Sequence, residues 1–159
     1  MSTVFWGLSG ASVRGTLLGD GTLRRYAFYG DSLLGWLVAR VLWERGLSSV
    51  YNAGGKFGFT AGLGPGEAAG QLSVAKAYYV SNERLARYAD DAVPQWLGSM
   101  QAVLDEAGVE GIIWDAQSEH NKGTIMEALL WAVYLARGER EAEDVVRGLV
   151  EWGDAQRDL

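Results

Sequence analysis

The sequence predicts an all-α fold of about six or seven helices. Apolar residues recur at spacings of three and four over most of the chain, which is the pattern of helices with one buried face. Strand-type alternation of any length and internal repeats are both absent from the sequence. With 159 residues, 48% of them hydrophobic and 21% charged, we expect one domain, spanning residues 1–159, with a single core.

The first long helical segment is predicted from residue 17 to Gly46, where a glycine favours a helix stop. From Phe28 onward it is apolar on nearly every face, which is typical of a helix at the centre of a domain. One carboxylate, Asp31, interrupts this pattern. It is either a first-turn carboxylate favoured by the helix dipole or a group with a chemical role.

The rest of the chain is predicted as a loop followed by helices. Residues 51–70 are rich in glycine and contain a proline, so we expect a long loop there. Loops of this length in compact domains are usually functional or held by a partner. Helical patterns follow over residues 67–90 with a break at Ser81, over 93–109, over 122–138, and from 139 to an end at Gly153.

Composition excludes several classes of protein and site. The net charge of −6 argues against a nucleic-acid binder that neutralises phosphates over a broad surface, so we expect any contact with structured RNA to be local. The absence of cysteine excludes disulfides and thiolate metal sites and fits an intracellular setting. His120 is the single histidine, which excludes a multi-histidine site. No apolar run reaches the ~20 residues that cross a bilayer, so no membrane is expected.

Asp31 and Glu127 form a pair by their setting, because each lies early in a strongly apolar helical segment. Acidic side chains are rarely buried unless they are paired, hydrogen-bonded or bound to a cation. For Glu127 the alternative is an ordinary position on the polar stripe of its helix. The residue pattern leaves both interpretations open.

Three segments, in this order over most of the chain, resemble the ribonuclease III domain family: "YAFYGDSLLGWLVARVLWERG", "LSVAKAYYVSNERLARYA" and "KGTIMEALLWAVYLARGEREAEDVV". The first is similar to the family's signature helix, E-x-L-E-F-L-G-D-[SA]-x-L-G. The other two resemble its next helical pair and its late K-x-D-x-x-E-A-L segment. The resemblance implies the all-α endonuclease-domain fold and a dimer. No double-stranded-RNA-binding domain is expected in this chain.

The departures from the family's pattern concern its metal site. Four carboxylates, spaced i,i+4 on one helix and i,i+3 on another, hold the divalent metal in that family, which lets two helix faces converge on Mg²⁺. Here the matching positions are Ala27, Asp31, Thr124 and Glu127. The resemblance therefore implies that Asp31 and Glu127 are the remnant of the catalytic and metal-binding set, with weak or absent metal binding.

We therefore expect a non-catalytic ribonuclease III-like domain that serves as a structural and docking component of a large ribonucleoprotein. The models are the ribonuclease III-like proteins of mitochondrial large ribosomal subunits and the degenerate partners in RNA-editing complexes. Under this hypothesis no cofactor is expected, and the partners are other ribonucleoprotein subunits. For a ribosomal protein, the expected location is the mitochondrial matrix. The alternative is a cytoplasmic, Mg²⁺-dependent double-stranded-RNA endonuclease of the Mini-III kind that uses Asp31 and Glu127. A half-active heterodimer partner lies between the two.

Partner contact is expected around Phe28. It matches the aromatic residue that, in the family, inserts into a pocket on the partner subunit, and the alternative is an ordinary core phenylalanine. Tyr26 and Tyr29 flank it, and exposed aromatic residues mark interfaces. We expect these three residues to contact a ribonuclease III-type homodimer or heterodimer partner.

Two further pairs of residues carry weaker expectations. His120 and Lys122 are candidates for local phosphate contact with RNA, the alternative being a solvated loop. Trp6 and Trp114 lie in less regular segments than the other tryptophans, which makes them candidates for partner surfaces.

Overall fold

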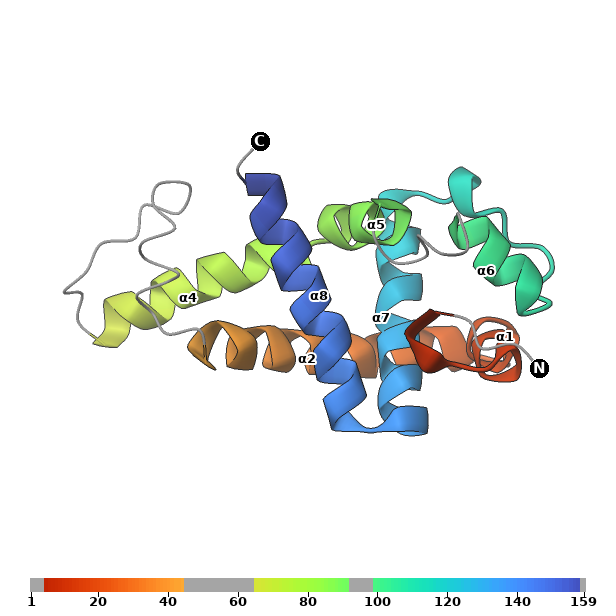
Figure 1. Cartoon of the computed structure of the whole chain (residues 1–159), viewed down its shortest axis with the longest axis horizontal. Coiled ribbons are helices and arrows are strands. Elements are labelled where there is room, and N and C mark those ends of the chain that lie inside the picture. The colour runs from red at the N-terminus through yellow and green to blue at the C-terminus, as the bar shows by residue number, and fades with distance from the viewer. Residues whose placement is uncertain (1–4, 45–64, 92–98, 158–159) are drawn as a thin grey trace.

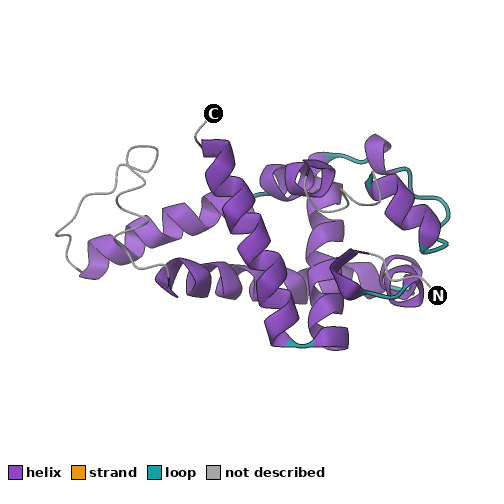
Figure 2. Ribbon diagram, in the orientation of Figure 1, coloured by secondary structure: helices purple, strands orange, loops and turns teal. Residues whose placement is uncertain are grey.

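The computed structural model describes residues 5–44, 65–91 and 99–157, and this part of the chain is helical (Figure 2). It contains seven α-helices and two short 3-10 helices, and no strand occurs among these residues, so the all-α prediction is confirmed. The helices are η1 (Phe5–Gly7), α1 (Gly10–Leu18), α2 (Thr22–Glu44), α4 (Pro65–Val80), α5 (Asn82–Asp91), α6 (Met100–Glu106), η2 (Trp114–Ala116), α7 (Glu119–Arg137) and α8 (Glu139–Arg157).

Helices α2 and α7 cross at the centre of the fold, and the other helices pack around this crossing (Figure 1). Helix α5 packs on the first half of α7, and α8 follows α7 in the opposite direction and also contacts α2. Helix α1 packs on both α2 and α7 at the side of the fold near the N-terminus. Both central helices contribute fully buried side chains to one continuous core, among them Leu37, Val41, Met126, Leu129 and Val133. None of the described helices is long and apolar enough to cross a membrane.

Glycines set how closely the central helices approach. A Cβ atom on Gly30 of α2 would lie 1.9 Å from the backbone oxygen of Glu127 on α7, so the two backbones touch at the crossing. A Cβ atom on Gly123 would likewise lie 2.2 Å from Oδ1 of Asn82 in α5. Neither place has room for a side chain, which fixes α7 against both neighbours.

The start of α2 differs from the prediction. The chain turns between α1 and α2 with Gly21 at a φ of 67°, a conformation that favours glycine, and α2 begins at Thr22. Asp31 is therefore in the middle of a 23-residue helix, and the first-turn interpretation of its carboxylate is wrong. Gly46, the predicted stop, lies outside the described residues.

Two other predicted boundaries have different outcomes. The break at Ser81 is confirmed, because its hydroxyl caps α5 by accepting a hydrogen bond from the backbone N–H of Arg84 at 3.2 Å. Helix α4 begins at Pro65, so the last residues of the predicted loop 51–70 are helical. Residues 51–64 of that loop lie outside the described part of the chain.

The predicted helix end at Gly153 is wrong, because α8 continues to Arg157. Gly153 is buried within the helix, and a Cβ atom there would lie 2.9 Å from the ring of Tyr79. The hydroxyl of Tyr79 bonds Asp154, and that of Tyr78 donates to the Gly153 carbonyl at 3.3 Å. Because Gly153 has no side chain, the ring of Tyr79 packs directly against α8, and the helix continues past the glycine.

Trp114 is a core residue, which corrects its assignment to a partner surface. Its side chain is 1% exposed, and its Nε1–H donates to Asp90 at 2.5 Å. The ammonium of Lys122 bonds the other oxygen of Asp90 at 3.3 Å and lies 5.1 Å from the centre of the tryptophan ring. These contacts hold the segment before α7 against α5. Trp6 is half-buried and packs against the core, with a left-handed φ of 60°.

Candidate functional site

The helix crossing brings Asp31 and Glu127 together. Asp31 follows Gly30 on α2, and Glu127 is the residue of α7 whose backbone touches that glycine. Asp31 is exposed and Glu127 is partly buried, and their carboxyl groups are close enough to interact. Two acids that are 96 positions apart in the sequence thus form one carboxyl pair, and we use this name for them below.

The electrostatics of the carboxyl pair follow from this placement. Burial, and then the hydrogen bond and negative charge of Asp31, raise the pKa of Glu127 to about 8. The protonated form of Glu127 is therefore favoured to a higher pH than for an ordinary carboxyl group. Because its pKa is raised above the ordinary value of 4.5, the group stabilises the fold fully below about pH 4.5. That contribution is lost as the pH rises through about 8.

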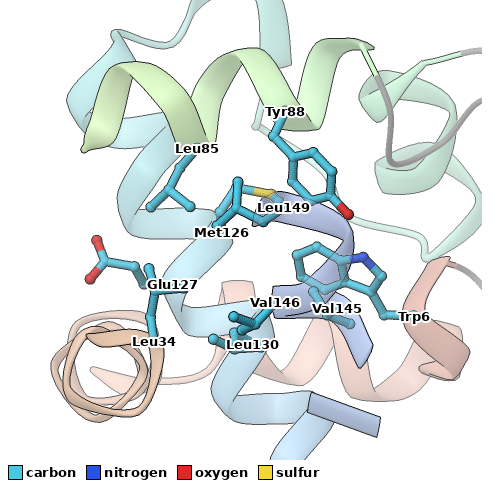
Figure 3. Close-up of a pocket in the computed structure, with 10 residues that line it drawn as sticks. All are labelled: Trp6, Leu34, Leu85, Tyr88, Met126, Glu127, Leu130, Val145, Val146 and Leu149. Carbon is cyan, nitrogen blue, oxygen red and sulfur yellow. The ribbon is translucent and has the colours of Figure 1, made fainter. Parts of the chain in front are cut away.

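An apolar pocket lies on the inner side of Glu127, whose carboxyl group points away from it (Figure 3). In Figure 3, Glu127 lies beside Leu34 and Leu85 at one side of the pocket, and Trp6 and Tyr88 lie at the other. The room inside is about 10 Å³, close to the smallest space that holds one water molecule. This pocket is a well-packed part of the core and has no space for a ligand.

The described surroundings of the carboxyl pair add no further acidic ligand for a Mg²⁺ ion. Ala27 offers no ligand, and the hydroxyl of Thr124 donates to the backbone oxygen of His120 at 2.9 Å. Within residues 5–44, 65–91 and 99–157, no group of three or more His, Cys, Asp or Glu side chains is placed to hold a metal ion. Asp31 and Glu127 would therefore supply at most two carboxylates to a Mg²⁺ ion, and water would have to complete its ligand shell.

Contacts between aromatic rings extend from two exposed residues of α2 to two partly buried residues of α7. Phe28 is 71% exposed and Tyr29 is 44% exposed, so the interpretation of Phe28 as a core residue is wrong. The ring of Tyr29 lies 5.7 Å from that of Phe28 and 5.1 Å from that of Trp131, which stacks on Tyr134 at 4.9 Å. We call these four residues the aromatic surface. Tyr26 is half-buried against the core beside them.

The two residues predicted to contact RNA have different surroundings. His120 lines an open cleft between the first turns of α2 and α7, whereas Lys122 is occupied by Asp90 and has a side chain only 12% exposed. We call this opening the α2–α7 cleft. Its lining residues are Leu23, Arg24, Gly111, Ile112, Gln117, His120, Asn121, Thr124 and Ile125.

Sequence reasoning missed most of this cleft. In the sequence, Arg24 is only one of several charged residues expected on the surface of its helix, and Gln117 and Asn121 belong to no motif. The cleft forms only when α2 and α7 cross, so no local signal in the sequence indicates it.

Comparison of the chain with protein-family models, with curated proteins and with solved structures finds no match. The resemblance of its three segments to the ribonuclease III domain family therefore stands as a prediction from those residues.

Proposed function

We propose that this protein is a non-catalytic ribonuclease III-like domain that acts as a structural and docking component of a large ribonucleoprotein. The observation that supports this best is the carboxyl pair. Asp31 and Glu127 are the two acids that the crossing of α2 and α7 brings together, and they are the only acids left at the four positions of the resemblance. Ala27 and Thr124 supply no replacement.

The aromatic surface supports the docking part of the proposal. Aromatic residues are enriched at protein interfaces, where they contribute large apolar contacts. Phe28 and Tyr29 are the exposed members on α2, and we assign them to contact with a ribonuclease III-type partner, either a second copy or a related chain. The net charge of −6 suits protein contacts better than broad contact with RNA. A ribosomal role would place the protein in the mitochondrial matrix.

A second candidate function is a Mg²⁺-dependent endonuclease of double-stranded RNA. It is favoured by the crossing of α2 and α7, which brings the carboxyl groups of Asp31 and Glu127 close enough to interact. Glu127 would have to lose its proton to bind a cation. Activity of this kind should therefore rise with pH toward and beyond about 8.

The test is a cleavage assay on structured RNA with Mg²⁺ or Mn²⁺, run at pH 7 and pH 9, with the Asp31→Asn variant beside the natural chain. The proposal predicts no cleavage by either protein at either pH. Cleavage that is present in the natural chain and abolished in Asp31→Asn would establish the endonuclease instead. Thermal melts with and without Mg²⁺ give a second readout, because a bound cation would raise the melting temperature.

A further inference from the structure

We propose that the α2–α7 cleft binds a nucleotide through its phosphate group, directly and without a bridging metal ion. The cleft has a volume of about 630 Å³, within the range of about 300 to 1,000 Å³ that is usual for small-molecule sites. It lies beside the carboxyl pair but does not include it. The inference is therefore independent of whether the protein docks in a ribonucleoprotein.

The charge of the lining points to an anionic ligand. Arg24 and His120 line the cleft and no carboxylate does, although the chain has 20 acidic and 14 basic residues. Arg24 is exposed, and it forms no ion pair with any residue that the structure describes. A guanidinium group that faces an opening without an acidic partner is suited to hydrogen bonds with phosphate oxygens.

Neighbouring polar groups fix the wall of the cleft. Nδ1 of His120 lies 3.1 Å from the side-chain nitrogen of Asn82, and with Nδ1 accepting that hydrogen bond, Nε2 carries the proton and is a donor. The amide of Asn121 donates to Gln117 at 3.3 Å, and that of Gln117 donates to the Ile113 carbonyl at 3.2 Å. These bonds hold the residues around the beginning of α7 in place before a ligand binds, which lowers the entropic cost of binding.

The apolar part of the lining suits the rest of a nucleotide. Leu23, Ile112 and Ile125 line the cleft together with the polar groups, so a base or ribose can pack on aliphatic side chains while the phosphate faces Arg24. Inorganic phosphate would leave the exposed parts of Leu23 and Ile112 uncovered. We therefore expect a nucleotide to bind more tightly than phosphate alone.

Thr124 links this cleft to the change at the carboxyl pair. It lines the cleft at the position where the ribonuclease III resemblance expects an acid. A carboxylate there would repel a phosphate group that approached Arg24, whereas a hydroxyl does not. The same substitution that removes a metal ligand thus permits direct binding of an anion.

The experiment measures binding of AMP, inorganic phosphate and a short single-stranded RNA to the full chain by calorimetry, in buffer that contains EDTA. We expect AMP to bind, with inorganic phosphate at least several-fold weaker. The Arg24→Gln variant should weaken AMP binding by about tenfold or more, the loss of a charge-assisted hydrogen bond. Thr124→Asp should weaken it similarly through repulsion.

The matched control is Arg25→Gln, which removes the same charge one residue away, at an exposed position that does not line the cleft. Its AMP affinity should stay within about twofold of the natural chain, because a solvent-exposed charge outside the cleft is screened and makes no hydrogen bond to the phosphate. Far-UV circular dichroism verifies that each variant is folded. If Arg24→Gln does not fold, His120→Gln takes its place, because glutamine can keep a hydrogen bond to Asn82 while the ring donor is lost.

The outcomes separate the sources of the phosphate. Binding of AMP that Arg24→Gln and Thr124→Asp weaken supports a free nucleotide. Binding of the RNA alone, with the same sensitivity to both variants, supports the same cleft with the phosphate supplied by a polymer. Absence of binding by all three probes would overturn the proposal, as would equal losses in Arg24→Gln and Arg25→Gln.

Discussion

Substitution of Gly30 by alanine should destabilise the protein strongly, although alanine is the better helix former. The new Cβ atom would lie 1.9 Å from the Glu127 oxygen, and side-chain carbons essentially never approach closer than 3.0 Å, so α2 and α7 must separate by at least about 1 Å. Forcing an extra carbon into a packed contact costs about 1 to 3 kcal/mol. Because the clash is with backbone, we expect the upper end of that range.

Gly35→Ala provides the matched control on the same helix. A Cβ atom there would meet only the end of the Lys76 side chain, with Nζ at 3.5 Å, which is an ordinary contact. This variant should gain up to about 1 kcal/mol from helix propensity. Urea unfolding followed by circular dichroism measures both, with a lower midpoint for Gly30→Ala and an unchanged or higher one for Gly35→Ala. Equal midpoints for the two variants would refute the close crossing of α2 and α7.

Three further predictions concern the site and its surroundings. The free energy of unfolding of the natural chain should fall between about pH 4.5 and pH 8, by at most about 1.4 kcal/mol per pH unit, and Glu127→Gln should flatten this fall in urea titrations. Asp90→Ala should cost about 1 to 3 kcal/mol in the same assay, because the buried N–H of Trp114 loses its acceptor. Phe28→Ser should weaken self-association or partner association in native mass spectrometry. It should leave the monomer's melting temperature nearly unchanged, because Phe28 is 71% exposed. A large drop in melting temperature would contradict its surface position.

The sequence predicts the helical class well because helix periodicity and capping are local signals. Ser81 illustrates this: a capping hydroxyl with Glu83 and Arg84 two and three residues later is enough to indicate the start of α5. The start of α2 is harder to predict, since apolar residues continue on both sides of the turn at Gly21. A prediction from periodicity alone therefore merges α1 and α2 into one helix.

The errors elsewhere come from tertiary contacts that no local pattern reports. Gly153 would end an isolated helix, but the ring of Tyr79, 74 positions earlier, packs where its side chain would be. Trp114 lies in an irregular segment, yet Asp90 and Lys122 make it a core residue. The pairing of Asp31 with Glu127 was expected only through a resemblance between segments.

The contact of Gly30 with the backbone of α7 also bears on how this chain changes over evolutionary time. A glycine that is needed for packing is retained by selection for folding, whatever becomes of the neighbouring acids. A glycine in this setting is therefore informative about how two helices pack, and it carries no information about the chemistry of the acid beside it.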